Sequence, residues 1–436
     1  MRRIPTLNRP NAPAPAPAQS APAARTVSVT GVDWPASRIM DDPVTAGVLH
    51  SVWSGDPVTV VPSPPGAGKT TLVALLAATL SDRAGLRVAI AAQTRAQAAE
   101  VAARTGRLTE CVRLAWPKTQ PAPDLGQTKA VLSQGRGTLR YPVSGGGVIV
   151  ATTARWLLSD PQQLAADVII VDEAWQATYG DVGALGAFAP QAVMVGDPGQ
   201  IAPVVTGSTQ RWEGSPTGPH VPAPLAIMAA YGDAVSVVTL RHTWRLGPAT
   251  TALIQPACYP QMPFASRRPH EHITLDGQAA PEVAVVQVNA PGGPADEAML
   301  ATVAERARRL IEHGSLTTNE GTRAIDGDDV LVVLPHVSQA GAVRAMLSDH
   351  PGVLVGTANA VQGMERPAAV ALHPLAGYRE ANAFGTDPGR ACVMLSRHRA
   401  HLTVVADTGT AAVLRTAEDT PDVQTHRLLW EGLTTV

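Results

Sequence analysis

The chain has 436 residues, a formal net charge of −2 and 45% hydrophobic residues. This length predicts about two or three domains with sizeable cores. The charge excludes a broadly basic body, so a nucleic-acid partner would have to be held in a local, arginine-lined groove. The three cysteines, Cys111, Cys258 and Cys392, form no C-x-x-C motif. This spacing argues against a zinc or iron–sulfur site and favours a reducing compartment.

The N-terminal segment differs in composition from the rest of the chain. Residues 1–26 are rich in proline and alanine and have little to bury, which predicts a disordered tail and a candidate contact for a protein partner. No apolar segment of the secretory type follows Met1, and no apolar run approaches the length of a membrane span. We therefore expect an intracellular, cytoplasmic protein without a membrane partner.

Strand and helix patterns alternate from about residue 30, which predicts an α/β fold with a mostly parallel sheet covered on both faces. A second alternating block starts near Val283, so we expect two related domains joined around 246–282. Residues 106–147 interrupt the first block and indicate a small insertion, and 205–225 is expected to be a loop. The expected strands are 58–61, 88–92, 148–151, 168–171, 192–195, 283–288, 330–334, 353–355, 369–372 and 402–405. The expected helices are 70–80, 96–105, 153–158, 296–313 and 338–348.

The first motif is Ser-Pro-Pro-Gly-Ala-Gly-Lys-Thr-Thr at 63–71, between a predicted strand and a predicted helix. Backbone N–H groups and the helix N-terminus in such a loop bind phosphates. Lys69, one of only three lysines in the chain, can reach the β- and γ-phosphates, and the Thr70 hydroxyl can hold Mg²⁺. A Gly/Pro turn that matches by chance is the alternative, which the flanking elements disfavour. The predicted ATP-binding residues of this loop are Pro65, Gly66, Ala67, Gly68, Lys69, Thr70 and Thr71.

Two further polar segments follow predicted strands. Asp172 and Glu173 come directly after strand 168–171, at the end where parallel sheets bind ligands. Asp172 can hold Mg²⁺ and Glu173 can deprotonate the attacking water; the alternative is an acidic helix cap. Gly-Asp-Pro-Gly-Gln at 196–200 can aim Gln200 at the γ-phosphate or the water, although Asp-Pro-Gly is also common turn chemistry.

The order of these motifs resembles that of superfamily 1 helicases, and most of all the branch of the nonsense-mediated-decay RNA helicase and its DNA-acting relatives. The resemblance runs from about residue 45 to 410 and includes Asp-Glu-Ala-x-Gln at 172–176 and Gly-Asp-Pro-x-Gln at 196–200. Thr243 and Trp244 replace the branch's Gln and Tyr, and the adenine-recognising Gln is not evident before the P-loop, which leaves base selectivity open. Further matches lie at 92–97, 148–153, 240–245, 334–339, 355–365 and 390–397.

The resemblance implies two RecA-like parallel-sheet P-loop domains, at 27–245 and 246–436, with the insertion at about 106–147 in the first. It also implies that Arg245 and Arg397, the latter after a strand-like segment at 391–395, reach ATP across the domain cleft as catalytic residues. Glu365 would contact the ribose or couple the two sites. The remaining implied residues are Gln362 and Gly363 at the ATP site, and Thr94, Thr153 and Thr357 on the phosphates of a nucleic-acid strand.

The function implied by the resemblance is an ATP-dependent helicase or translocase on single-stranded DNA or RNA, moving 5′ to 3′. An ATPase that remodels protein–nucleic-acid complexes without unwinding is equally open. A P-loop kinase or GTPase, or a non-catalytic module, is disfavoured by the motif set. Trp116, Trp156 and Trp212 are candidate base stackers, with core packing the favoured role for each. The insertion has a local excess of basic residues and is a candidate strand-facing element, with a solvated loop as the alternative.

Overall fold

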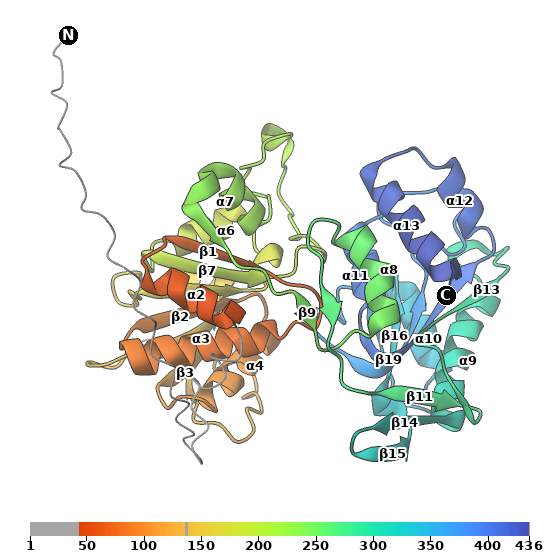
Figure 1. Ribbon diagram of the computed structural model, residues 1–436, viewed down its shortest axis with the longest axis horizontal. Coiled ribbons are helices and arrows are strands. Elements are labelled where there is room, and N and C mark those ends of the chain that lie inside the picture. The colour runs from red at the N-terminus through yellow and green to blue at the C-terminus, as the bar shows by residue number, and fades with distance from the viewer. Residues whose placement is uncertain (1–42, 136–137, 436) are drawn as a thin grey trace, which may run out of the picture.

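The computed structural model describes residues 43–135 and 138–435. Figure 1 shows two α/β lobes side by side, each built around a parallel sheet. The expected tail at residues 1–26 lies outside the described residues. Within the part of the chain that is described, no helix has the length and apolar character needed to cross a membrane.

The first sheet has eight strands, and every neighbouring pair in it is parallel. All five strands expected from the first block are present in it. Two of its strands, β3 and β4, come from the region 106–147 and extend one edge of the sheet. The order across the sheet is β4 (Val131–Ser133), β3 (Val112–Ala115), β5 (Gly147–Thr152), β2 (Arg87–Ala92), β6 (Val168–Asp172), β7 (Gln191–Gly196), β1 (Val58–Pro62) and β8 (Val235–Val237).

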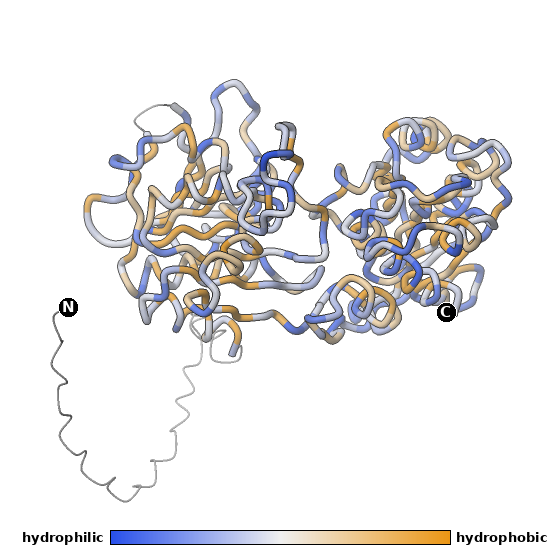
Figure 2. The backbone as a smooth tube through the Cα atoms, turned by 90° about the horizontal axis from the view of Figure 1, so that it is seen from above, coloured by the Kyte–Doolittle hydropathy of each residue, from blue (hydrophilic) through white to orange (hydrophobic). Residues whose placement is uncertain are grey.

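Helices cover both faces of this sheet, which explains why β2 is apolar in every residue after the exposed Arg87. Val88 and Ile90 belong to the core on one face, whereas Ala89 and Ala91 belong to the core on the other. Figure 2 shows the hydrophobic strands running through the interior of this lobe. A strand buried on both faces has no solvent-facing residue, so the apolar run is continuous. The helices of this lobe are α2 (Pro43–Trp53), α3 (Lys69–Ala84), α4 (Arg95–Gly106), α5 (Thr153–Leu157), α6 (Tyr179–Leu185) and α7 (Ala223–Tyr231).

The second sheet has five strands, all paired in parallel. The two parallel sheets confirm the expected two-part α/β fold. Its strands, in order, are β13 (Val283–Val288), β19 (His398–Asp407), β18 (Arg366–Leu372), β16 (Val330–Leu334) and β17 (Leu354–Thr357). The helices around it are α8 (Pro248–Cys258), α9 (Glu297–His313), α10 (Val337–Met346), α11 (Pro388–Leu395), α12 (Thr410–Thr416) and α13 (Pro421–Thr435).

Two small sheets complete the fold. A four-stranded antiparallel sheet flanks the second lobe, and a two-stranded parallel ladder lies in the segment that connects the lobes (Figure 1). The first is formed by β12 (Gln278–Ala279), β11 (His272–Leu275), β14 (Gly314–Thr318) and β15 (Gly321–Ala324), and the second by β9 (His242–Thr243) and β10 (Ala265–Ser266).

The expectation of a strand-like segment at 391–395 is wrong, because this segment is the end of helix α11. Asp387 caps the helix by accepting hydrogen bonds from the backbone N–H groups of Gly389 and Arg390, and Pro388 occupies the first turn. A short apolar run has no periodicity that separates a buried helix from a buried strand. Here all five residues of 391–395 are buried, and α11 packs against α8 and α13, which explains why this end of the helix is apolar all round.

Candidate active site

The P-loop connects β1 to α3 and is fixed to the turn after β7. Gly68 adopts a left-handed conformation, with φ of 86°, and Lys69 is the first residue of α3. The fully buried Ser63 donates its hydroxyl to the carbonyl of Gly196 at 2.7 Å, and its backbone N–H donates to the same oxygen at 2.9 Å. The serine in place of the usual glycine therefore ties the phosphate loop to the Gly-Asp-Pro-Gly-Gln turn.

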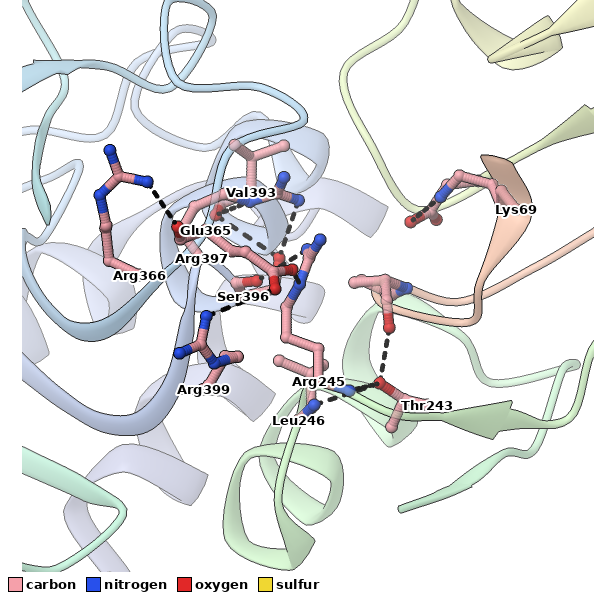
Figure 3. Close-up of polar contacts among 12 residues, drawn as sticks. Lys69, Thr243, Arg245, Leu246, Glu365, Arg366, Val393, Ser396, Arg397 and Arg399 are labelled. Atoms are coloured by element: carbon pink, nitrogen blue, oxygen red, sulfur yellow. Dashed lines mark hydrogen bonds and ion pairs between the residues drawn. The ribbon is translucent and has the colours of Figure 1, made fainter. Parts of the chain in front are cut away.

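The segment after β9 is fastened to the other side of the P-loop. The Thr243 hydroxyl donates to the carbonyl of Pro65 at 2.7 Å (Figure 3). The Trp244 N–H donates to the carbonyl of Gly66 at 2.9 Å. Gly66 has a φ of 70°, and a Cβ there would collide with the Cβ of Arg245. Any other residue at Gly66 would push Arg245 away from the loop, so this glycine permits the close approach of the two segments.

Asp172 and Glu173 sit at the carboxyl end of β6. Asp172 is 3% exposed, and burial, followed by the nearby Glu173 charge, raises the pKa of Asp172 to about 7. Glu173 has a φ of 52°, a left-handed backbone that is unfavourable for a side chain with a Cβ. Such strain is found where a side chain must be aimed. It turns the Glu173 carboxylate to within 3.7 Å of the Lys69 ammonium.

Asp197, which follows β7, holds several of these groups together. Its carboxylate lies 3.8 Å from the Lys69 ammonium and accepts hydrogen bonds from the Gln200 amide at 2.5 Å and from the Tyr259 hydroxyl at 2.7 Å. Asp197 is 1% exposed and Tyr259 is 2% exposed. Tyr259 follows α8 and also contacts Cys392 of α11, with its hydroxyl 3.2 Å from the sulfur. Asp197 therefore links Tyr259 of the second lobe to Lys69 of the P-loop.

Glu365 and Gln362 of the second lobe contact residues of the first lobe, and Figure 3 shows Glu365 beside Arg245. Arg245 forms an ion pair with Glu365, and the Gln362 amide donates to the Gln200 side-chain oxygen at 3.2 Å. Although burial alone would raise the pKa of Glu365, the Arg245 charge lowers it overall. The ionised carboxylate is therefore the stable form beside Arg245.

Arg397 is a nearly fully buried cation, with 1% exposure. Its guanidinium donates to the carbonyl of Val393 at 3.1 Å and to the Ser396 hydroxyl at 3.2 Å, and no carboxylate of the described chain forms an ion pair with it. Burial, and then the Arg245 charge, lower the pKa of Arg397 to about 10, so it remains protonated at neutral pH. A desolvated cation without an ion-pair partner is a strong anion-binding group.

One cavity of about 360 Å³ collects residues from both lobes. Pro65 and Gln362 do not line it. Pro65 directly precedes Gly66 of the lining, and the Gln362 amide donates to Gln200 of the lining. The cavity brings together most of the residues expected at the nucleotide site, namely Gly66, Ala67, Gly68, Lys69, Thr70, Thr71, Asp172, Glu173, Gln200, Arg245, Gly363, Glu365 and Arg397.

The cavity also contains groups that the sequence did not assign to the site. Glu100 and Arg104 lie one turn apart on α4 and form an ion pair, and Arg104 also donates to the Thr71 hydroxyl at 3.2 Å. Trp244 lines the cavity with a side chain that is 54% exposed. Asp197 could have been found, because it too follows a strand of the parallel sheet at the edge where ligands bind. Nothing in the sequence indicates that α4 turns Glu100 and Arg104 toward the P-loop.

The donor set fits a magnesium ion that arrives with a nucleotide. In the described ranges, no group of three or more His, Cys, Asp or Glu residues is arranged to hold a metal. Mg²⁺ commonly takes one or two protein oxygens and completes its shell with phosphates and water. The buried Asp172 carboxylate and Thr70 line the same cavity and supply oxygen donors of this kind.

The three threonines expected to touch a strand lie outside this cavity. Thr94 caps α4 by accepting from the Gln97 N–H, and Thr357 ends β17. Thr153 is 7% exposed, and its hydroxyl lies 3.4 Å from the Gln93 side-chain oxygen. The Gln93 amide in turn donates to the carbonyl of Asp172 at 3.3 Å. Thr153 is therefore linked to the acidic pair through a single side chain.

Comparison with known proteins agrees with a nucleotide-binding first lobe. Residues 45–213 match the family model described as AAA domain. Over 205 residues the chain is 32% identical to the RecBCD enzyme subunit RecD of Mycolicibacterium smegmatis. That alignment covers 45% of this chain and 34% of the relative, so this chain matches about a third of the curated relative's length.

The similarities to solved structures are distant. Arterivirus nonstructural protein 10, a helicase, has a TM-score of 0.44 at 16% identity, covering 80% of this chain and 59% of that chain. Its complex with DNA has a TM-score of 0.45 at 17% identity, covering 81% and 61%. The helicase of PRRSV has a TM-score of 0.43 at 14% identity, covering 84% and 55%.

Replacing Asp172 with Asn should stabilise the metal-free protein in a pH-dependent way. The wild-type carboxyl has a pKa of about 7 in the folded state against an ordinary value of 3.8, so the unfolding free energy falls as pH rises between these values. Asp172→Asn has no carboxyl at this position, so its unfolding free energy does not fall in this way as the pH rises. Its melting temperature should exceed that of the wild type by a few degrees at about pH 8, and the difference should shrink as the pH falls toward about 4. A difference that does not change with pH would contradict the buried, shifted carboxyl.

Removing the Tyr259 hydroxyl should reduce turnover of a nucleoside triphosphate without loosening its binding. Tyr259→Phe keeps the ring but removes the hydrogen bond to Asp197, and we expect kcat to fall about tenfold with KM little changed. Tyr141→Phe is the matched control, because the Tyr141 hydroxyl is buried, has no hydrogen-bond partner and lies outside the cavity. Equal kcat values in the two variants would argue against a positioning role for Tyr259.

Proposed function

We propose that this chain hydrolyses ATP with Mg²⁺ and couples the cycle to movement along single-stranded DNA or RNA, as a helicase or translocase. The single observation that carries the proposal is the shared cavity, in which the P-loop, the acidic pair and Arg245 of one lobe face Glu365 and Arg397 of the other. The first lobe alone lacks the positive charge that Arg397 of the second lobe brings to the transferring phosphoryl group. A site completed by a second lobe makes the relative position of the lobes depend on the nucleotide.

Each group has a chemical role that its surroundings support. Lys69 lies 3.7 and 3.8 Å from two carboxylates, longer than a strong hydrogen bond, so its ammonium is free to bind a γ-phosphate. The strained Glu173 is aimed into the cavity as the base for the attacking water. Arg397 supplies positive charge where negative charge develops on the transferring phosphoryl group. When bound, Mg²⁺ neutralises charge on the β- and γ-phosphates.

The nucleotide base has a candidate platform at the open side of the cavity. Trp244 stands where the resembling branch has a tyrosine, and its exposed ring can stack on a base without reading its edge. Arg104 and Glu100 on α4 lie along the same cavity. This arrangement supports binding of a nucleoside triphosphate with little selection for adenine.

We place the division between the domains at residues 245 and 246. Arg245 lies beside the P-loop, whereas α8, which starts at Pro248, packs against α11 and α13 of the second lobe. The connection therefore lies beside the nucleotide site. The 5′-to-3′ direction and the kinship with the nonsense-mediated-decay branch rest on the motif resemblance.

The direct test is ATPase activity with and without single strands. We expect oligo-dT or oligo-rU to increase turnover in the wild type, Lys69→Ala to abolish turnover by weakening phosphate binding, and Glu173→Gln to bind ATP but hardly hydrolyse it. Turnover close to wild type in both variants would contradict the site. Failure of every strand to stimulate turnover would contradict the coupling. Stimulation without displacement of a duplex strand would favour the remodelling ATPase over the helicase.

Loss of Arg397 should impair the chemical step. Arg397→Ala should reduce the single-turnover hydrolysis rate at least about 100-fold with a much smaller change in ATP affinity, and Arg397→Lys should not restore the rate because the planar guanidinium is lost. Arg415→Ala, which removes an exposed arginine on α12, is the matched control. An unchanged rate in Arg397→Ala, in a protein with normal melting temperature, would remove the second lobe from the catalytic site.

A further inference from the structure

The carboxyl edge of the first sheet divides into two halves. The turns after β1, β6 and β7 line the nucleotide cavity. Four of the other five strands, β2, β5, β3 and β4, end at a separate hollow of about 730 Å³. Because all eight strands are parallel, the two hollows open along the same edge of one sheet. The residues of the second hollow used below are Arg95, Trp116, Lys118, Arg155, Leu158 and Asp160.

One part of this hollow is apolar and preformed. Trp116 follows β3 and is fixed by two hydrogen bonds, from its backbone N–H to the carbonyl of Ser133 at 3.0 Å and from its indole N–H to that of Pro121 at 2.9 Å. Its ring is half-buried and lines the hollow together with Leu158, which is 84% exposed. A fixed indole beside an exposed leucine is a surface on which a flat aromatic ring can stack.

The other part of the hollow is cationic. Arg95, Lys118 and Arg155 line it, and none of the three forms an ion pair with a carboxylate in the described residues. Arg155 donates to the Ser159 hydroxyl at 2.7 Å. The acidic residue of the lining, Asp160, is bound to the side chain of Gln163 at 2.9 Å. The hollow therefore carries more positive than negative charge, which suits a polyanion that also has flat, apolar groups.

We propose that this hollow is a subsite for a single-stranded polynucleotide, with one unstacked base against Trp116 and neighbouring phosphates on Lys118, Arg95 and Arg155. A single strand offers both features at once, since its bases are free to stack and its backbone is charged. The choice of occupant rests on the proposed function. The assignment of these side chains rests on the geometry of the hollow.

Binding of fluorescent oligo-dT and oligo-rU, measured by anisotropy without nucleotide, tests the subsite and tells DNA from RNA. Trp116→Ala should weaken binding about tenfold. Lys118→Ala should reduce the slope of log affinity against log salt by about 0.7, the value for one phosphate contact in a single strand. Trp53→Ala, which removes a tryptophan that is 75% exposed on α2, should bind like the wild type. Affinities and slopes equal to wild type in the Trp116 and Lys118 variants would overturn the subsite.

Photocrosslinking keeps the test decisive if Trp116→Ala does not fold. An oligo-dT or oligo-rU strand carrying 5-iodouracil should crosslink the wild type within the peptide that contains Trp116, and Lys118→Ala should reduce the yield. Crosslinks confined to other peptides would overturn the subsite. Strand-stimulated ATPase with crosslinks elsewhere would leave the proposed function standing. Crosslinking at Trp116 without any stimulation would support the subsite and reject the coupled motor.

Discussion

The structure depends on how charge is balanced in one cavity between the lobes. Lys69, Arg245 and Arg397 share this space with Asp172, Glu173 and Glu365, and most of these groups are largely desolvated. Only Arg245 and Glu365 form a close pair. Lys69 is held at a distance between two carboxylates, and Arg397 is bonded only to uncharged oxygens. Buried charges left without close partners are costly, and a metal-bound triphosphate would supply the missing anions to Lys69 and Arg397 while neutralising the acidic pair.

A few hydrogen bonds and ion pairs connect the charged groups of the cavity to both lobes. Asp197 joins Lys69 to Tyr259, and Gln200 joins Gln362, so both lobes are anchored on the turn after β7. On the opposite side, Gln93 lies between the carbonyl of Asp172 and the Thr153 hydroxyl, close to the second hollow. Lys69 is thereby connected to the second lobe, and the backbone of Asp172 to Thr153. These links are hydrogen bonds with defined partners, which makes the coupling open to single substitutions.

The sequence predicted the parts of the molecule that local patterns determine. Strands buried on both faces read as apolar runs, and the P-loop and Asp172–Glu173 follow such runs directly, so their shared sheet edge was predictable. Segment 391–395 was mispredicted because all five of its residues are buried, so it shows no helical alternation of apolar and polar residues. The sequence identified Asp197 only as part of a turn, because its contacts with Lys69 and Tyr259 form only in the folded chain. The sequence could not tell Trp116 from Trp156 as a candidate base stacker. In the structure Trp156 is fully buried, whereas Trp116 lines a hollow.

The central claim is that both lobes contact the transferring phosphoryl group. It is tested most directly by a crystal structure with Mg²⁺, ADP and tetrafluoroaluminate, which imitates that group in its transition state. The account predicts that the Lys69 ammonium and the Arg397 guanidinium both contact the fluoroaluminate, with Arg397 released from the Val393 carbonyl that it bonds at 3.1 Å here. A fluoroaluminate bound by the P-loop alone, with Arg397 still on Val393, would contradict it.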